Sequence, residues 1–213
     1  MKNYQIAIAD DHPIVRLGVR TILSENPQFK VSVEYEDAKS LLGDYAQANW
    51  DVLVLDIDLR DGNGVDLTKQ MLAQRPELKI LILSIYPEEK YALRAMRAGA
   101  KGYVNKDALL DILNKAVMDV AMGKLFVSEP LAQTLAQHAL NGGGDELPHD
   151  KLSDRELQVL CLYGDGKGNN EIAAHLHVSV KTISTYRSRI MDKMQLHSTA
   201  ELISYAIRHE LVR

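Results

Sequence analysis

The sequence predicts two domains of different class, an α/β domain with a parallel sheet followed by a small all-α domain. Three observations predict this division. Short apolar runs alternate with helically spaced apolar residues over residues 1–122. A hydrophilic segment with three consecutive glycines, at residues 141–150, then interrupts the pattern. Beyond it, residues 152–213 show helical spacing, with a short helix, a tight turn and a longer basic helix in succession.

The strongest strand signal is the run Val52–Leu55, which is apolar throughout and contains two β-branched residues. A strand without a polar face is typical of a parallel sheet that helices cover on both sides. The other predicted strands are residues 6–9, 31–35, 79–84 and 102–104. Ile14, Leu17 and Ile22 fall at helical spacing and predict a first helix that Asn26-Pro27 ends. Further helices are predicted at residues 38–46, 65–74, 88–98 and 108–122.

Five strand-helix units in about 120 residues predict a doubly wound five-stranded sheet in the flavodoxin-like order, which places the first, third and fourth strands side by side. Polar residues follow these strands. They are Asp10 and Asp11 after the first, Asp56 and Asp58 after the third, Ser84 after the fourth, and Lys106 after the fifth. Because ligands bind in the crevice beyond the carboxyl ends of parallel strands, we expect these side chains to lie together.

The residue types predicted to meet there suit a phosphoryl group. Carboxylate oxygens at this density are ligands for Mg²⁺. Asp56 can act as a nucleophile, the metal can bridge it to phosphate, and Ser84 and Lys106 can bind the remaining oxygens. Taken singly, each acid could instead begin a solvated loop, since polar residues after strands are ordinary turn formers.

This combination resembles the receiver domain of bacterial response regulators over residues 4–122. The resemblance implies that Asp56 accepts a phosphoryl group and that Lys106 binds the phosphoryl oxygens. It assigns Mg²⁺ to Asp10, Asp11, Asp56 and Asp58, the last through its backbone carbonyl.

The resemblance also pairs Ser84 with Tyr103 as a switch. Ser84 would turn inward to bond the phosphoryl group, leaving room for the Tyr103 ring to swing inward. Three residues depart from the common pattern. Arg60 replaces a frequent proline, Asp107 replaces the proline that usually follows the lysine, and Asp58 adds a charge where many relatives are neutral. We expect a competent site whose rate of phosphorylation these residues modify.

The composition is that of a globular protein, with 46% hydrophobic and 25% charged residues. No apolar run approaches the roughly 18 residues needed to span a bilayer, and no signal peptide is apparent. Cys161 is the single cysteine and cannot form an internal disulfide. We therefore expect a cytoplasmic protein with no membrane partner.

The domain boundary is expected where the pattern changes. Residues 1–122 form the first domain, and residues 152–213 form the second. Residues 123–151 are predicted to be a linker, with a helix at 130–140 and a flexible tether at 141–150. The alternative, a long surface loop within one domain, is disfavoured because the composition and the periodicity both change beyond this segment.

The second domain begins with a capping box, in which Ser153 caps a helix and Glu156 follows three residues later. This helix ends near Gly164, and Asn169 or Asn170 caps the next. The remaining helices are predicted at residues 171–176, 180–194 and 198–209. A short helix, a turn and a longer helix form a helix-turn-helix pattern.

The helix at 180–194 is locally basic although the chain has a net charge of -4, which is a modest signature of phosphate binding. Its inward face is expected to consist of Ile183, Tyr186, Ile190 and Met194. Lys181, Ser184, Thr185 and Ser188 share another face and are expected to reach base edges, whereas Arg187, Arg189 and Lys193 suit the flanking phosphates. Thr182 is a further expected DNA-binding residue. The alternative is a solvated face on a four-helix protein-interaction module.

Residues 152–194 resemble the LuxR-type output domain, so the whole chain resembles the NarL/FixJ family of response regulators. The matching segments are Leu152-Ser153-x-Arg155-Glu156, Asn170-Glu171-Ile172-Ala173-x-x-Leu176, Val178-Ser179-x-Lys181-Thr182-Ile183 and Lys193-Met194. The run from Lys181 to Tyr186 is similar to the BvgA and EvgA branch. Ser184 and Tyr186 replace more familiar residues, which affects the expected base preference.

The resemblance implies a DNA-binding transcription regulator rather than an enzyme, phosphorylated on Asp56 by a sensor histidine kinase or a phosphotransfer protein. It implies a homodimer on double-stranded promoter DNA and contact with RNA polymerase. One alternative is a regulator that needs no phosphorylation and uses its receiver only for pairing. Another is a phosphohydrolase of the haloacid dehalogenase type, suggested by the Asp56-x-Asp58 pair. That class carries its pair on the first strand, whereas this pair follows the third.

Overall fold

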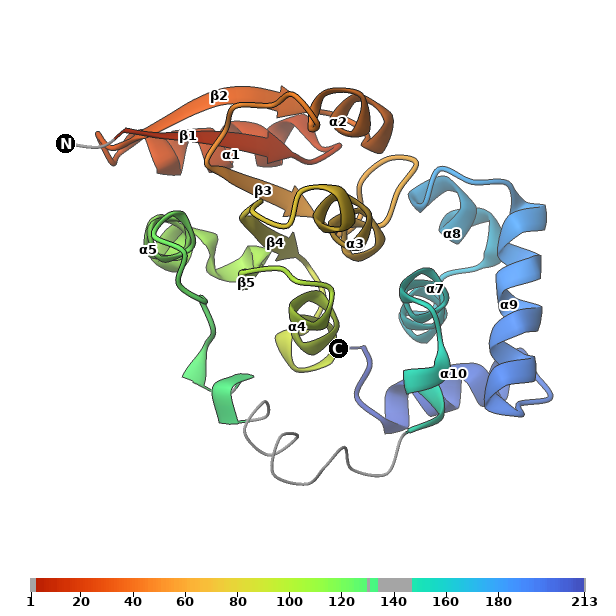
Figure 1. Ribbon diagram of the computed structural model, residues 1–213. Coiled ribbons are helices and arrows are strands. Elements are labelled where there is room, and N and C mark those ends of the chain that lie inside the picture. Colours follow the sequence, from red (N-terminus) through yellow and green to blue (C-terminus); the bar gives the residue numbers. More distant parts are fainter. Residues whose placement is uncertain (1–2, 130, 134–146, 213) are drawn as a thin grey trace. The chain divides into compact units, whose positions relative to one another are not determined.

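The structure is a computed structural model that describes residues 3–129, 131–133 and 147–212. The chain divides into two compact units, residues 1–134 and 135–213 (Figure 1). Each unit has its own core and is described by itself.

The first unit is built on a parallel sheet with the order β2-β1-β3-β4-β5, as the sequence predicts. Its strands are β1 (Tyr4–Ala9), β2 (Phe29–Tyr35), β3 (Val52–Asp56), β4 (Ile80–Ser84) and β5 (Gly102–Asn105). Its helices are α1 (Pro13–Ser24), α2 (Ala38–Asp44), α3 (Gly64–Gln74), α4 (Glu88–Arg97) and α5 (Leu109–Ala121), with a 3-10 turn η1 (Lys106–Ala108) before α5.

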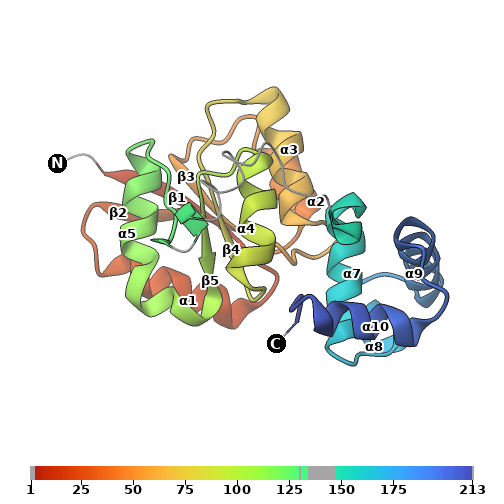
Figure 2. The same ribbon diagram turned by 90° about the horizontal axis from the view of Figure 1, so that it is seen from below.

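Helices cover both faces of this sheet, with α1 and α5 on one side and α2, α3 and α4 on the other (Figures 1 and 2). Every residue of β3 is buried, as expected for a central strand. Val52 and Val54 point toward α1 and α5 and pack in one apolar core with Leu113 and Val117. The two covered faces hold the sheet rigid and leave its carboxyl end free for polar groups.

Helix α1 exposes Ile14 and Leu17, two of the residues whose spacing predicts the helix. Ile14 is 75% exposed and Leu17 is 46% exposed, whereas Val19, Ile22 and Leu23 are buried. Arg16 lies on the same buried side. The helix therefore packs an apolar stripe of Val15, Val19, Ile22 and Leu23 against the sheet, with the Arg16 cation buried beside it.

Residues 123–129 and 131–133 belong to the first unit, beyond the boundary predicted at residue 122. The backbone N–H of Phe126 donates to the carbonyl of Lys101 (2.8 Å), and Phe126 packs against the apolar core. Leu131 is buried as well. Apolar side chains thus extend the unit along the segment that was predicted as linker.

Most of the helix predicted at 130–140 and of the tether predicted at 141–150 lies outside the described residues. Residues 148–150, the end of the predicted tether, lie in a 3-10 turn, η2 (Pro148–Lys151). The carboxylate of Asp150 accepts a hydrogen bond from the Leu147 N–H (2.9 Å). His149 Nδ1 and the Tyr205 hydroxyl share another (2.8 Å). These bonds give the hydrophilic segment a fixed conformation before the first helix of the second unit.

The second unit consists of α7 (Asp154–Gly164), α8 (Asn169–His175), α9 (Val180–Met194) and α10 (Thr199–Arg208) (Figure 2). Helix α7 is its centre, because nearly all of its residues are buried. A Cβ atom at Gly164 would lie 2.8 Å from the Cβ of Ala206, so glycine there allows α7 and α10 to pack closely. Among the described residues, no helix is long and apolar enough to cross a membrane.

Candidate functional sites

The register of the sheet brings Asp10 and Asp56 together. Ala9 of β1 pairs with Leu55 of β3, so the residues that follow them, Asp10 and Asp56, lie at the same edge of the sheet. Lys106 Nζ is 2.8 Å from Asp10 Oδ2 and 2.8 Å from Asp56 Oδ2. Both carboxylates are buried. One lysine therefore bridges two buried acids at the carboxyl end of the sheet, as the sequence predicts.

The charges in this cluster depend strongly on one another. Burial raises the pKa of Asp56 to about 8; Lys106 opposes this shift, and the carboxylates of Asp10 and Asp58 add to it. Burial alone would lower the pKa of Lys106, but Asp56 and Asp10 raise it above its ordinary value. An added cation beside Asp56 would favour the ionised carboxylate, which is the nucleophilic form.

Four side chains form a group that could hold a metal ion. Ligand atoms of Asp10, Asp11, His12 and Asp56 all lie within 4.8 Å of one another. His12 Nδ1 is 2.7 Å from Asp11 Oδ1. Three carboxylates of this kind fit a hard divalent cation such as Mg²⁺. The Asp58 side chain lies outside the group, and the role of its backbone carbonyl stays a prediction.

The sequence does not predict His12 as part of this group; its place follows from the turn after β1, which the linear sequence does not show. Its side chain is 55% exposed. Its backbone N–H donates to Asp10 Oδ1 (2.8 Å), which leaves Asp10 Oδ2 directed at Lys106. His12 thus helps to orient the Asp10 side chain.

The loop after β3 is fixed by two close backbone approaches. The Gly64 N–H donates to the Ile57 carbonyl (2.8 Å), and a Cβ at Gly64 would collide with the carbonyl oxygen of Asp56. Only glycine allows α3 to begin this close to the strand end. Arg60, which departs from the receiver pattern, accepts a hydrogen bond from the Ala38 N–H through its carbonyl (3.1 Å), and its side chain is exposed.

Ser84 and Tyr103 lie close together and are both buried. The Tyr103 hydroxyl donates to the carbonyl of Tyr86 (2.8 Å), and Asn105 Nδ2 donates to the same oxygen (3.1 Å). The Tyr86 N–H donates to Ser84 Oγ (3.0 Å). Burial raises the pKa of Tyr103 even though a bond to Ser84 lowers it, so the phenol stays protonated as a donor. The predicted switch pair is thus connected through the loop that follows β4.

In the second unit, the predicted capping box is present at the start of α7. Ser153 Oγ accepts from the Glu156 N–H (3.3 Å), and Glu156 Oε2 accepts from the Ser153 N–H (2.8 Å). Glu156 also pairs with Lys193 of α9, at 2.6 Å. Burial would raise the pKa of Glu156, but Lys193 and Ser153 hold it below its ordinary value. Lys193, predicted at phosphates, is therefore engaged within the unit, where it joins α9 to α7.

The cap of α8 differs from the prediction that Asn169 or Asn170 occupies it. Gly168 is the N-cap, and Glu171 Oε2 accepts from its N–H (2.7 Å). Asn169 is instead bound by Tyr163, whose hydroxyl donates to Asn169 Oδ1 (2.7 Å). Because the Asn169 side-chain oxygen accepts this bond from Tyr163 of α7, Asn169 does not use it to cap α8.

Helix α9 presents distinct faces. Ile183, Ile190 and Met194 are buried as predicted, whereas Tyr186 is only half-buried. The predicted DNA-binding residues divide into an exposed set, Lys181, Thr185, Ser188, Arg189 and Lys193, and a half-buried set, Thr182, Ser184 and Arg187. The hydroxyl of Thr182 shares a hydrogen bond with Ser179 at the helix start (2.8 Å), so it serves the cap.

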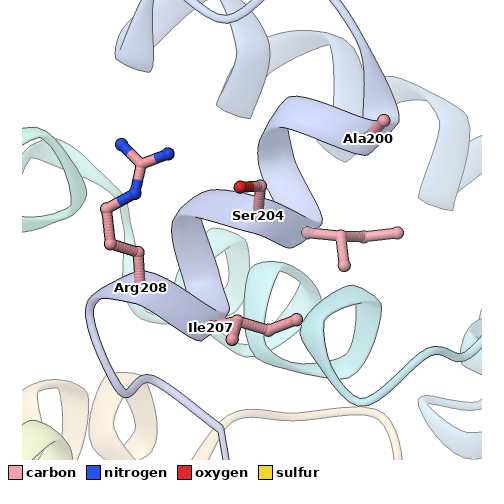
Figure 3. A pocket seen from close by; sticks show the side chains of 5 residues that line it. Ala200, Ser204, Ile207 and Arg208 are labelled. Carbon is pink, nitrogen blue, oxygen red and sulfur yellow. The ribbon is translucent and has the colours of Figure 1, made fainter.

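Helix α10 carries an exposed, shallow hollow on one side. It is lined by Ala200, Ile203, Ser204, Ile207 and Arg208, which recur one helical turn apart (Figure 3). Ile207 is 58% exposed. A mainly apolar helix face of this kind can bury against a matching helix.

Two family models match the chain. Residues 6–118 match the response regulator receiver domain, and residues 150–206 match the bacterial regulatory proteins of the luxR family. Among curated proteins, the chain is 37% identical to the Fimbriae Z protein of Salmonella typhimurium over the full length of both. It is 36% identical to the oxygen regulatory protein NreC of Staphylococcus carnosus, covering 98% of this chain and 99% of that protein.

Solved structures agree with this result. The regulator RcsB of Salmonella enterica serovar Typhimurium, bound to the promoter rprA in the presence of phosphomimetic BeF3-, is similar with a TM-score of 0.64 and 28% identity, covering 96% of this chain and 98% of that chain. The response regulator ChrA of a heme-sensing two-component system gives a TM-score of 0.51 and 30% identity, covering 99% of this chain and all of that one.

The Glu156 contacts predict an effect on stability. Glu156→Gln should lower the free energy of unfolding of the second unit by about 1–2 kcal/mol at pH 7, because it removes the capping charge and the partner of Lys193. Since folding lowers the pKa of Glu156, the difference from the native protein should be full above the ordinary carboxyl value of 4.5 and shrink as the pH falls below it.

Urea unfolding followed by far-ultraviolet circular dichroism at several pH values measures this difference. Glu201→Gln is the matched control, since Glu201 accepts from the His197 N–H at the start of α10 and is exposed. A loss at Glu201 as large as that at Glu156, or a difference that grows toward low pH, would contradict the assignment.

Proposed function

The chain belongs to the NarL/FixJ family of response regulators, and on that premise we propose that phosphorylation of Asp56 controls how tightly its LuxR-type domain binds promoter DNA. The observation that supports this proposal most directly is the buried contact of Lys106 with both Asp10 and Asp56. It joins a candidate nucleophile, a candidate metal ligand and a cation for phosphoryl oxygens in one place.

In the proposed reaction, an oxygen of the Asp56 carboxylate attacks the phosphorus of a phosphohistidine on a partner kinase or phosphotransfer protein. The phosphorus–oxygen bond to Asp56 forms as the phosphorus–nitrogen bond to the imidazole breaks, and the histidine leaves. Lys106 is placed to bind an oxygen of the transferred group, because it already contacts Asp56 Oδ2 at 2.8 Å. Ser84, buried at the end of the adjacent strand, is the proposed second ligand.

The proposed metal is Mg²⁺, with Asp10, Asp11 and Asp56 as its carboxylate ligands and Asp58 contributing its backbone carbonyl. When bound, the ion would supply positive charge that offsets the negative oxygens of the phosphoryl group. The acids support this role by their chemistry, since they offer hard oxygen atoms within 4.8 Å of one another. Lys106 then balances the remaining charge of Asp10 and Asp56.

The proposed DNA-contacting element is α9. Lys181, Thr185 and Ser188 are exposed one turn apart and are proposed to face base edges in the major groove. Arg187 and Arg189 are proposed to bind the flanking phosphates. Ser184 donates its hydroxyl to the Val180 carbonyl (3.1 Å), so it is proposed to accept from a base. Lys193 is given a smaller role than the sequence predicts, because Glu156 neutralises it.

We further propose that the protein acts in the cytoplasm as a dimer on DNA, with RNA polymerase as a partner. The hollow face of α10 supports a dimer contact in the second unit, since its exposed Ile207 would be buried there. Paired units raise affinity through effective concentration, so any change that favours dimers also strengthens binding. The solved relative RcsB has been described as two dimers bound to two parallel DNAs.

The role of Asp56 predicts where a phosphoryl group attaches. With Mg²⁺ and acetyl phosphate, the native protein should gain one phosphoryl group, and Asp56→Asn should gain none because the nucleophilic carboxylate is gone. Intact-protein mass spectrometry measures the gain, and omission of Mg²⁺ should reduce it. Asp58→Asn is the matched control, since it removes a neighbouring carboxylate that lies outside the group of metal-binding side chains, keeps the backbone carbonyl proposed as a metal ligand, and should still be phosphorylated. Phosphorylation of Asp56→Asn would exclude the proposal.

The exposed face of α9 predicts two kinds of variant. Arg189→Ala should weaken binding about equally on all DNA sequences and reduce the slope of log affinity against log salt by about one. Thr185→Ala should instead alter the preferred bases and leave the salt slope unchanged. Affinity for a DNA library at several salt concentrations distinguishes them, with Lys30→Ala in the other unit as a control of equal charge. If Arg189→Ala leaves both affinity and slope unchanged, α9 is not the DNA-contacting element.

A further inference from the structure

Arg16 in α1 is a buried cation with three hydrogen bonds. Its Nη1 donates to the backbone carbonyl of Asp10 (2.7 Å), its Nη2 to Glu36 Oε1 (2.9 Å), and its Nε to Glu34 Oε2 (3.2 Å). The residue is only 7% exposed. A buried guanidinium is costly unless its donors are satisfied, and here the fork-shaped group reaches three separate acceptors.

These contacts connect the end of β1 to the end of β2. Glu34 lies within β2, and Glu36 is the first residue after the end of this strand. The backbone N–H of Asp10 donates to the Tyr35 carbonyl (3.2 Å), so the main chain of Asp10 is held on both sides, at its N–H by β2 and at its carbonyl by Arg16. Arg16 therefore fixes the position from which the Asp10 side chain starts.

The Asp10 side chain is then oriented by two more groups. Oδ1 accepts from the His12 N–H, and Oδ2 contacts Lys106. With its backbone and both carboxylate oxygens held, Asp10 has little freedom to change its place. An acid fixed in this way binds a cation without first losing side-chain and backbone entropy.

We propose that Arg16 is a positioning residue for the metal-binding acids, acting through the backbone of Asp10. The inference rests on the proposed function, because it takes Asp10 to be a metal ligand. Electrostatics alone gives Arg16 the opposite effect, since a nearby positive charge repels a divalent cation. The carboxylates of Glu34 and Glu36 balance the charge of Arg16, so its proposed effect on the metal-binding acids comes from the bond to the Asp10 carbonyl and not from its charge.

The proposal is tested by whether loss of Arg16 weakens or strengthens the binding of Mg²⁺. Calorimetric titration of the full chain with MgCl₂ should show that Arg16→Met binds Mg²⁺ about 10-fold more weakly than the native protein, as expected when an outer partner of a metal ligand is removed. If Arg16 acted only through its charge, the same variant would bind Mg²⁺ more tightly.

Arg20→Met is the matched control. Arg20 lies one turn further along α1 and also pairs with Glu34, through Nη1 and Oε1 at 2.8 Å, but its side chain is half exposed. Removing it deletes a similar ion pair and the same charge, so Mg²⁺ affinity should stay within about twofold of native. An equal loss in both variants would overturn the positioning role and indicate a general effect of Glu34.

Arg16→Lys keeps the charge but carries its donors on a single nitrogen, so it cannot span the three separate acceptors as the guanidinium does and should also lose about 10-fold in Mg²⁺ affinity. If Arg16→Met does not fold, the Mg²⁺ affinity of Arg16→Lys tests the positioning role instead. Circular dichroism and the emission of the single tryptophan, Trp50, report whether each variant is folded. Native affinity in a folded Arg16→Lys or Arg16→Met protein would overturn the inference. If the native protein itself binds no Mg²⁺, it is the proposed metal site that fails.

Discussion

The buried pairing of Lys106 with Asp10 and Asp56 is the interaction that organises the carboxyl end of the sheet in the first unit. Two carboxylates this close repel each other, and both are buried. The positive charge of Lys106 offsets this repulsion. Lys106 follows the fifth strand, whereas Asp10 follows the first and Asp56 ends the third. The parallel sheet order is therefore a condition for the site. A sheet wound in another order would leave Asp56 without its cation.

The surrounding structure serves to keep this cluster in place. Gly64 lets α3 start against the backbone of Asp56, and Arg16 holds the backbone of Asp10. On the far side, the hydroxyl of Tyr103 fixes the loop after β4, which also binds Ser84. A phosphoryl group on Asp56, as proposed, would add negative charge beside this set of contacts. In the second unit Glu156 has a comparable place, because one buried acid caps α7 and binds α9.

Much of this could be predicted from sequence because strand ends carry a strong signal. The five strand-helix units predict the strand order, and the apolar runs that end at Asp10, Asp56 and Ser84 predict where these side chains meet. Long-range contacts made by single side chains could not be predicted. Arg16 reaches Glu34 and Glu36 only because α1 packs beside β2, and its helix shows apolar residues, such as Ile14, on the exposed side.

The second unit shows the same limit. The capping box at Ser153 is a local pattern and is found as predicted, whereas the partner of Lys193 lies 37 residues away. A lysine on a basic helix looks like a phosphate contact until the fold brings Glu156 beside it. The cap of α8 differs for the same reason, since Tyr163 of another helix binds Asn169. Spacing identifies the elements, and packing decides which polar groups remain available to a ligand.

The most direct test is the affinity of the whole protein for promoter DNA, measured across a promoter library with and without acetyl phosphate and Mg²⁺, beside the Asp56→Asn form. If Asp56 controls the output domain, phosphodonor should tighten binding and increase the dimer fraction in the native protein only. Binding that is equally tight with and without phosphodonor, and unchanged in Asp56→Asn, would contradict that control and leave the receiver as a pairing module.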